Sequence, residues 1–400
     1  MRRILVVGGS LAGHRTAHAL REQGFDGELT VLGAEPHPPY DRYPLSKDYL
    51  TGSVERSGLD IGPLASDITW RWGAVATGVD LERRQVSTAS GAVHLFDGLV
   101  VATGARARGG DLIAPDIAGA FVVRTVTDAE RLRGALAGSA KLVVVVGGGL
   151  IGAEIASVAA AAGHRVTLVD RAAVPTVHAL GPSVAAYVHR ERLRREVQVV
   201  RRRGSSLDVR DRRAVGVLLD DGARLAADVV VFATGTSPNT EWLAGSGLQL
   251  ADGLVCRPTL HAYGSDAVVG VGDVARVPAP LLDGDPVRAE HWSSARLQAV
   301  VAAENLLSGL GAGRRFDGVP VFATTLHGAR ARVAGFPGFA EEEVVLAGDV
   351  LAGRAVVGLR RAGVSVGVVA LNADAELREV FESERAVLGK AHHDCQQSTI

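Results

Sequence analysis

Residues 142–170 read LVVVVGGGLIGAEIASVAAAAGHRVTLVD, and the rest of the chain can be understood by comparison with them. The five apolar residues at 142–146 predict a short buried strand, and Gly147, Gly149 and Gly152 follow it with G-x-G-x-x-G spacing. In such a turn the first glycine permits the tight bend, the second lets backbone N–H groups approach a pyrophosphate, and the third lets a helix pack on the strand. We therefore expect a buried strand that leads into a phosphate-binding turn at a helix N-terminus.

The residues after this turn supply the other parts of a dinucleotide site. An alanine-rich helix is predicted over 153–162, and a second strand over 166–169 ends at Asp170. Asp170 lies 23 residues after Gly147, about where a carboxylate accepts hydrogen bonds from an adenosine ribose, with a generic strand-end turn as the alternative. Because a carboxylate there repels a 2′-phosphate, the pattern favours NADH over NADPH, while the neighbouring Arg171 leaves NADPH open.

A second copy of the turn stands at the start of the chain. Residues 4–7 predict a strand, and Gly8, Ser10 and Gly13 occupy the three glycine positions. Ser10 adds a Cβ where backbone would approach a phosphate, but its hydroxyl can itself donate to one. A helix, a second strand and then Glu35, a carboxylate for a ribose, follow in the same order as before. The chain is therefore predicted to hold two dinucleotide sites.

Each glycine turn is followed, farther along the chain, by a buried strand that ends in Ala-Thr-Gly. These tripeptides lie at 102–104 and 233–235. The first glycine of the turn and the threonine are 95 residues apart in the first copy and 87 in the second. We interpret this as an internal duplication, which predicts two Rossmann-like α/β domains that bind two different dinucleotides.

The second half of the chain returns to the first domain and then begins a third. A turn is expected at 237–240, and a strand at 268–274 carries Asp273 at its tip. A long helix is predicted over 294–307. From residue 319 the apolar residues form short alternating runs, which predict an antiparallel sheet with a terminal helix. The predicted domains are 1–110 joined with 238–318, then 111–237, then a small α+β domain at 319–389, followed by a disordered tail at 390–400.

The composition excludes several classes of protein. The net charge of −1 argues against nucleic acid as the main partner. The only two cysteines, Cys256 and Cys395, stand 139 residues apart, so neither a redox C-x-x-C pair nor a metal site is predicted. So few cysteines fit a reducing cytoplasm, and a secretory signal is not expected. No apolar run reaches the roughly 18 residues that a membrane span requires, so no membrane is expected as a partner.

Taken together, these motifs resemble the FAD-dependent, NADH-oxidising ferredoxin reductases that serve bacterial dioxygenases and cytochrome-type monooxygenases. The resemblance covers about residues 2–385. It rests on eight motifs in the order of that family: VVGGSLAG at 6–13, EPHPPYDRYPLSK at 35–47, ATGA at 102–105, VVGGGLIGAEIA at 145–156, TGTSPNT at 234–240, VGDVA at 271–275, EHW at 290–292 and GVVALN at 367–372.

The resemblance implies which residues hold each cofactor. FAD would be bound by Gly8, Ser10, Ala12, Gly13, Glu35, Arg42, Lys47, Ala102, Thr103, Gly104, Asp273 and Trp292. NADH would be bound by Gly147, Gly149, Leu150, Ile151, Gly152, Glu154, Asp170, Arg171 and Gly235. Arg42 and Lys47 would reach the flavin side of the FAD site. Asp273 would bind the ribityl-phosphate region, and Trp292 would lie beside the isoalloxazine.

Lys47 and Glu154 are the catalytic pair that the resemblance implies. In this family such a pair lies near flavin N5, where the ammonium stabilises negative charge that develops on the reduced flavin. The carboxylate fixes the ammonium in place. The alternative is an ion pair that only joins two domains.

Two departures from the family's pattern bear on the electron acceptor. A segment like F-W-S-D-Q-Y-G reads FATTLHG at 322–328 here, so Ala323 stands where the family has an aromatic residue. The family's PPLSK reads YPLSK, with Tyr43 in the first position. Either ferredoxin docks differently on this chain, or the open face admits another acceptor.

The resulting interpretation is an enzyme, an NADH:ferredoxin oxidoreductase. Hydride would pass from NADH to flavin N5, and single electrons would then pass to a ferredoxin-type iron–sulfur protein. Ferredoxins are usually acidic, so arginines near the third domain are candidates for docking, with an ordinary solvated face as the alternative. These candidates are Arg314, Arg315, Arg330 and Arg332. The protein is expected to be a monomer or homodimer. Alternative functions are an NADH-dependent oxidase or small-molecule reductase, and a redox-responsive binding protein like apoptosis-inducing factor.

Overall fold

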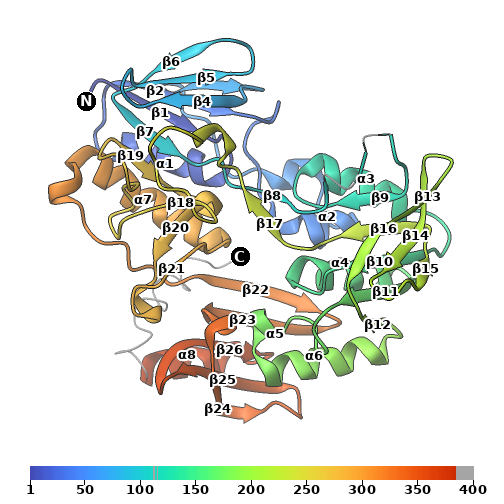
Figure 1. The fold of residues 1–400 in the computed structure, drawn as a ribbon. Coiled ribbons are helices and arrows are strands. Elements are labelled where there is room, and N and C mark those ends of the chain that lie inside the picture. The colour runs from blue at the N-terminus through green and yellow to red at the C-terminus, as the bar shows by residue number, and fades with distance from the viewer. Residues whose placement is uncertain (111–112, 115, 384–400) are drawn as a thin grey trace.

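The computed structural model describes residues 1–110, 113–114 and 116–383, and three five-stranded sheets organise them (Figure 1). Two of these sheets are parallel and the third is antiparallel. The predicted α/β fold, with two Rossmann-like units and a small α+β unit, is confirmed. Among the helices of the described ranges, none combines the length and the apolar character that a bilayer crossing requires.

The first parallel sheet has the order β19-β7-β1-β2-β3. Its strands are β1 (Arg3–Val7), β2 (Glu28–Gly33), β3 (Thr69–Trp72), β7 (Gly98–Val101) and β19 (Val268–Gly270). Central β1 is apolar and almost wholly buried, as a strand covered on both faces must be. Helix α1 (Leu11–Glu22) follows β1 directly and packs against α7 (Trp292–Ser308). A small antiparallel sheet adjoins this unit and consists of β4 (Ala76–Asp80), β5 (Gln85–Thr88) and β6 (Val93–Leu95).

The second parallel sheet repeats this arrangement, with the order β12-β11-β10-β16-β9. Its strands are β9 (Ala120–Val122), β10 (Leu142–Val146), β11 (Arg165–Asp170), β12 (Gln198–Arg201) and β16 (Val229–Phe232). In both sheets the strand before the glycine turn is central, between the next parallel strand and the strand that leads into Ala-Thr-Gly. The helices of this unit are α3 (Val126–Leu136), α4 (Leu150–Ala161), α5 (Val177–Leu180) and α6 (Pro182–Arg194). An antiparallel sheet of β13 (Gly204–Arg210), β14 (Arg213–Leu219) and β15 (Arg224–Ala226) completes it.

The third sheet is antiparallel, with the order β22-β23-β26-β25-β24. Its strands are β22 (Val321–Leu326), β23 (Ala329–Gly335), β24 (Glu342–Asp349), β25 (Arg354–Arg361) and β26 (Val364–Leu371), and α8 (Asp374–Ser383) follows them. The apolar runs that predicted this sheet lie at 344–346, 355–359 and 364–371, so the hairpin β22–β23 was not among the strands expected from the sequence. Its alternation of alanine, threonine and arginine carries little apolar contrast, so pairing with the neighbouring strand β26 identifies it only in the folded chain.

Several boundaries differ from the sequence-based expectation. The turn predicted at 237–240 is wrong, because β17 (Thr236–Pro238) pairs with β8 (Ala105–Ala107) and joins the two Ala-Thr-Gly segments. β19 ends at Gly270, so Asp273 lies in a 3-10 turn and not on a strand. α4 and α7 each begin earlier than expected. The tail predicted at 390–400 lies outside the described residues, and the domain boundaries stay a prediction.

The third unit packs on the second through a shared apolar core. Ala153 of α4 and Val184 and Val188 of α6 belong to the same buried cluster as Leu326 of β22 and Leu359 of β25. The loop before α2 (Asp48–Thr51) reaches this region from the first unit through a 3-10 turn at Tyr43–Ser46. β22, α4 and this loop therefore meet at one place. The short strands β18 (Leu254–Val255), β20 (Ala275–Pro278) and β21 (Pro286–Val287) lie beside the first unit (Figure 1).

Candidate active site

The two glycine turns have the same local geometry. Gly8 and Gly147 both have a positive φ, of 120° and 106°, which glycine adopts without strain. A Cβ on Gly8 would lie 2.0 Å from the carbonyl oxygen of Ala102, and a Cβ on Gly147 would lie 2.2 Å from that of Ala233. Each turn therefore packs directly on its own Ala-Thr-Gly segment, as the duplication in the sequence implies.

The other glycines of the two turns have different tasks. A Cβ on Gly13 would lie 1.8 Å from the carbonyl oxygen of Gly8, and one on Gly152 would lie 1.9 Å from that of Gly147, so both positions require glycine for packing. A Cβ on Gly149, in contrast, would meet nothing within 4 Å. The second turn thus keeps an open cradle at the N-terminus of α4, which is the shape that a pyrophosphate needs. Its first helical residues are Leu150 and Ile151, and Ile151 is exposed.

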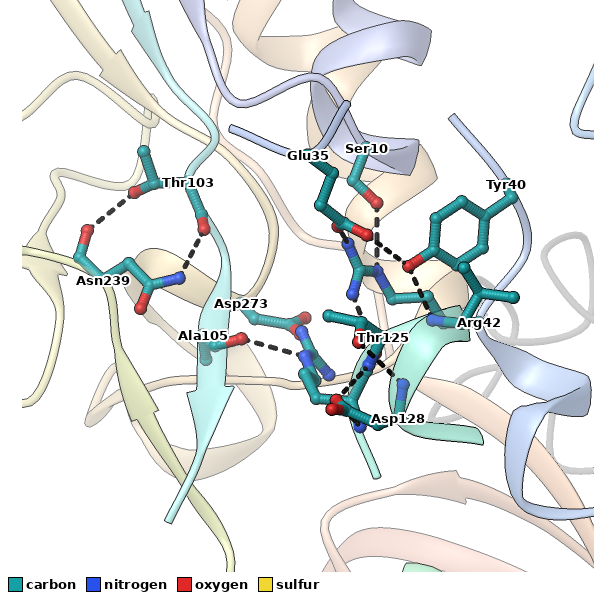
Figure 2. Close-up of polar contacts among 12 residues, drawn as sticks. Ser10, Glu35, Tyr40, Arg42, Thr103, Ala105, Thr125, Asp128, Asn239 and Asp273 are labelled. Atoms are coloured by element: carbon teal, nitrogen blue, oxygen red, sulfur yellow. Dashed lines mark hydrogen bonds and ion pairs between the residues drawn. The ribbon is translucent and has the colours of Figure 1, made fainter. Parts of the chain in front are cut away.

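Arg42 joins Ser10 of the first glycine turn to Glu35, which follows β2 (Figure 2). Arg42 Nε donates to Ser10 Oγ at 3.2 Å, and its Nη2 forms an ion pair with Glu35 Oε1. Tyr40, which the sequence reasoning did not single out, donates from its hydroxyl to Glu35 Oε2 at 2.6 Å. Burial raises the pKa of the Tyr40 phenol to about 12, so it remains a donor. Arg42 Nη1 also donates to the carbonyl of Arg124 at 2.8 Å, and the reach of Arg42 toward the flavin side stays a prediction.

Asp273 is held by Arg124, a second residue that the sequence reasoning missed. Arg124 Nη2 lies 2.5 Å from Asp273 Oδ2, and Arg124 Nε donates to the carbonyl of Ala105 at 2.9 Å (Figure 2). Arg124 stands just before α3, whose start is marked by a capping box between Thr125 and Asp128. That T-x-x-D pattern is the signal that would have placed Arg124 at the carboxyl edge of the second sheet.

The first Ala-Thr-Gly segment is hydrogen-bonded to Asn239, which lies four residues after the second. Thr103 Oγ1 donates to the carbonyl of Asn239 at 2.7 Å, and Asn239 Nδ2 donates back to the carbonyl of Thr103 at 2.9 Å (Figure 2). Gly104 and Gly235 both have a positive φ, of 63° and 95°, where the chain turns away from each sheet. Ala12 approaches Gly272, whose Cβ would lie 2.9 Å from that of Ala12. These contacts hold residues of 1–110 against residues of 238–318, the two parts of the chain that are predicted to bind FAD.

Lys47 and Glu154 meet where all three units join. Lys47 Nζ lies 3.0 Å from Glu154 Oε2, and the carboxylate side chain is only 4% exposed. Ser46 Oγ donates to Glu154 Oε2 at 2.5 Å, and Thr324 Oγ1 donates to Oε1 at 2.7 Å. The carboxylate therefore has a partner from the loop and from β22, in addition to the ammonium. Ser46 and Thr324 were not predicted.

Tyr43 faces the same ammonium. Lys47 Nζ lies 3.9 Å from the centroid of the Tyr43 ring and donates to the Tyr43 carbonyl at 2.9 Å. The Tyr43 hydroxyl donates to the carbonyl of Ala323 at 3.0 Å. The aromatic side chain that bonds the backbone of residue 323 is thus Tyr43 from the loop, and not a residue of β22.

Trp292 is the first residue of α7, and its place is defined by its neighbours. Arg296 lies over the indole ring with Cζ 4.5 Å from the centroid, and the indole N–H is buried without a partner among the described residues. The preceding His291 stacks on Phe322 with ring centroids 4.5 Å apart. Burial lowers the pKa of His291 to about 4, so its ring is neutral at pH 7. The role of Trp292 beside a flavin stays a prediction.

Both carboxylate oxygens of Asp170 accept hydrogen bonds from backbone N–H groups, one from the second glycine turn and one from the residues that follow Asp170. Oδ2 accepts from the N–H of Gly148 at 2.5 Å, and Oδ1 accepts from the N–H of Ala172 at 2.6 Å. Arg171 follows Asp170 and is exposed. Where β11 pairs with β12, Arg201 is the residue opposite Asp170. Arg201 Nε donates to the carbonyl of Arg171 at 3.4 Å, so Arg201 lies beside this turn at the carboxyl edge of the second sheet.

Cysteine and metal chemistry find no support in the described residues. Cys256 is buried, and burial raises the pKa of its thiol to about 12, so it remains a protonated thiol. Cys395 lies outside the described residues. Within ranges 1–110, 113–114 and 116–383, no three His, Cys, Asp or Glu side chains gather as a metal site.

Comparison with known proteins follows this geometry. A family model described as pyridine nucleotide-disulphide oxidoreductase matches residues 2–299. The chain is 33% identical over 368 residues to the biphenyl dioxygenase system ferredoxin–NAD(+) reductase component of Paraburkholderia xenovorans, covering 89% of this chain and 86% of that protein. The crystal structure of a covalent putidaredoxin reductase–putidaredoxin complex matches with a TM-score of 0.88 at 27% identity, covering 95% of this chain and 92% of the other. A ferredoxin reductase from Rhodopseudomonas palustris matches with a TM-score of 0.88 at 28% identity, covering 98% and 95%. The chain therefore belongs to the pyridine nucleotide-disulphide oxidoreductase family and, within it, to the ferredoxin reductases.

Proposed function

We propose that this chain oxidises NADH at a bound FAD and passes the electrons singly to a ferredoxin-type iron–sulfur protein. FAD, when bound, supplies the chemistry that accepts a hydride and releases single electrons. The observation that carries the proposal is the Lys47–Glu154 ion pair, 3.0 Å long, at the junction of two dinucleotide-binding units and the third unit. A fixed positive charge at this junction can stabilise negative charge on a reduced cofactor.

The first unit would hold FAD through its backbone and its acids. The α1 N-terminus would face the pyrophosphate, Glu35 the ribose, and Asp273 the ribityl-phosphate region. The residues assigned to this site are Gly8, Ser10, Ala12, Gly13, Glu35, Arg42, Lys47, Ala102, Thr103, Gly104, Asp273 and Trp292. Arg42 and Arg124 are ion-paired with Glu35 and Asp273, so each of these two assigned acids is held in place by a guanidinium group.

The second unit would hold NADH in the open cradle around Gly149. Asp170 would face the adenosine ribose and disfavour a 2′-phosphate. The residues assigned to this site are Gly147, Gly149, Leu150, Ile151, Gly152, Glu154, Asp170, Arg171 and Gly235. Glu154, with three donors on its carboxylate, would hold the Lys47 ammonium in place and would not itself transfer a proton.

An acidic ferredoxin is the partner that the arginines near β23 support. Arg330 and Arg332 lie 3.4 and 3.7 Å from the carboxylate of Asp374, and Arg314 pairs with Glu304. The related reductase crystallised with putidaredoxin offers the same kind of partner. A monomer or homodimer in the cytoplasm is part of this proposal, and the small number of cysteines supports a reducing compartment.

Mixing the purified protein with NADH tests the proposal. Bound FAD that bleaches rapidly, followed by cytochrome c reduction only after a ferredoxin is added, is the expected result. Turnover with oxygen or an organic acceptor alone would indicate an oxidase or small-molecule reductase. Slow bleaching to a long-lived reduced complex would indicate a redox-responsive binding protein. Protein purified without FAD and unable to take it up would contradict every one of these functions.

A further inference from the structure

We propose that Tyr43 is a positioning residue that holds the Lys47 ammonium against Glu154. The inference rests on the proposed function, because it concerns the same charged pair. It goes beyond that function by assigning a role to Tyr43, for which the proposed function names none. The role is carried by contacts that two different parts of Tyr43, its ring and its backbone carbonyl, make with one ammonium group.

The ammonium is fixed from three directions. Its Nζ lies 3.0 Å from the Glu154 carboxylate, 2.9 Å from the Tyr43 carbonyl and 3.9 Å from the centre of the Tyr43 ring. A lysine ammonium has three N–H donors on a flexible stem, so these partners match its donor capacity and limit its movement. The Lys47 side chain is only 15% exposed, and a cation over an aromatic face is held more strongly when it is shielded from water.

Tyr43 is itself held firmly enough to position another group. Its N–H donates to Asp41 Oδ1 at 2.9 Å, and its hydroxyl donates to the Ala323 carbonyl of β22 at 3.0 Å. Burial raises the pKa of the phenol to about 12, so the hydroxyl keeps the proton that this bond requires. The ring is thereby anchored at both ends, one in the loop and one on the third unit.

The contacts allow two roles that substitutions separate. If Tyr43 only ties the loop to β22, its hydroxyl matters and its ring does not. If it positions Lys47, the ring matters. Tyr43→Phe removes the hydroxyl bond to Ala323 and keeps the ring over Lys47. Tyr43→Leu and Tyr43→Met remove both, and Met fills the volume with a flexible chain.

The chain offers a direct spectroscopic readout, because its only lysines are Lys47, Lys141 and Lys390. Protein labelled with ¹³C-lysine should give three resolved ε-methylene signals. The ring current of Tyr43 should shift that of Lys47 upfield in the wild type and in Tyr43→Phe. We expect this shift to vanish in Tyr43→Leu or Tyr43→Met, whichever binds FAD.

The midpoint potential of the bound flavin is the functional readout. In the ring-deleted variants it should become more negative, and the rate of flavin reduction by NADH should fall about threefold to tenfold, in line with a partly shielded cation–π contact. Tyr43→Phe should retain both values. Tyr263→Leu is the matched control, since Arg257 lies over that ring at 5.0 Å on a distant surface, and it should change nothing.

Three outcomes would overturn the inference. The Lys47 signal and the potential could both stay unchanged in the ring-deleted variants. Tyr43→Phe could match those variants, which would assign the effect to the bond with Ala323. Tyr263→Leu could shift the potential equally, which would make the effect non-specific. Failure of the wild type to bind FAD or oxidise NADH would instead contradict the proposed function, so the two failures are distinguishable.

Discussion

The Nζ atom of Lys47 lies 3.0 Å from Oε2 of Glu154, and this contact links the loop of the first unit to helix α4 of the second. Thr324 of the third unit donates to the other oxygen of the same carboxylate. Burying a charge without partners is costly, which explains why Glu154 has three. One carboxylate therefore fixes the relative position of three parts of the chain at the place where a cofactor would react.

Glu154→Gln is expected to slow the reduction of FAD by NADH. The amide keeps a polar group for Ser46 and Thr324 but removes the charge that holds Lys47. We expect the rate to fall about tenfold, equivalent to ~1.4 kcal/mol in the barrier, measured as flavin bleaching in a stopped-flow instrument. Lys141→Met, which removes a half-buried lysine whose ammonium donates to the backbone carbonyls of Ala137 and Ser139, is the control. An unchanged rate in Glu154→Gln would mean that the pair only joins the units.

Gly149→Ala should weaken NADH binding, whereas Gly152→Ala should lower stability. A Cβ at 149 meets nothing within 4 Å, so it should leave the melting temperature unchanged and raise the Kd for NADH about tenfold by entering the cradle. A Cβ at 152 would lie 1.9 Å from the Gly147 carbonyl, so it should lower the melting temperature. Calorimetry and NADH titration measure the two quantities. Equal NADH affinity in Gly149→Ala and wild type would argue against a nucleotide in this cradle.

Asp170→Asn should shift coenzyme preference toward NADPH. The substitution removes the negative charge and leaves two arginines near residue 170, Arg171 next in the chain and Arg201 opposite it on β12. We expect the ratio of kcat/KM for NADPH to that for NADH to rise about tenfold, or ~1.4 kcal/mol. Asp211→Asn, on an exposed turn, should leave the ratio unchanged. A ratio that stays constant in Asp170→Asn would show that this carboxylate does not face the ribose.

The sequence was most informative where function depends on neighbouring residues. Both glycine turns and their flanking strands could be read directly, because the strand, the spaced glycines and the helix follow one another without a break in the sequence. Tyr43 and Thr324 could not be placed in this way. The first bonds a residue 280 positions away and the second one 170 positions away, so their roles exist only after the units have packed.

The partners of Arg42 could not be read from its motif. The motif at 35–47 located the loop correctly, but the direction of a long side chain depends on which acid lies within reach. Here Glu35 and Ser10 are closer partners than any group beside Lys47. The capping pattern at Thr125 was, by contrast, available in the sequence and would have indicated Arg124.

His327→Asn should reduce the loss of stability in acid. Burial, together with Arg192 and Arg195, lowers the pKa of His327 to about 3, so the folded protein keeps this ring neutral while the unfolded chain protonates it near the ordinary histidine pKa of 6.5. Stability is therefore lost as the pH falls from about 6.5 toward 3, by up to ~2 kcal/mol at pH 5. Asn tolerates the positive φ of 52° at this position. Melting temperatures at pH 7 and pH 5 measure the difference. His178→Asn, at an exposed site, should lose as much stability as the wild type, and an equal loss in His327→Asn would exclude this ring as the cause.

Arg330 and Arg315 should differ in their effect on electron transfer to ferredoxin. Arg330 lies on β23 opposite Thr325, and its charge acts on the Tyr43 phenol, so it is close to the Lys47–Glu154 junction. Arg315 follows Arg314, which is tied to α7 through Asn305 and lies away from that junction. Arg330→Glu should therefore raise the KM for ferredoxin about threefold to tenfold and weaken its dependence on salt, as expected for a charge at the rim of an interface. Flavin bleaching by NADH should change less than the KM for ferredoxin, because the substitution leaves Lys47, Glu154 and the Tyr43 ring in place. Arg315→Glu should leave both reactions as they are. Equal effects of the two reversals would mean that ferredoxin senses only the overall charge, and an effect confined to Arg315 would place its docking surface at the linker before β22.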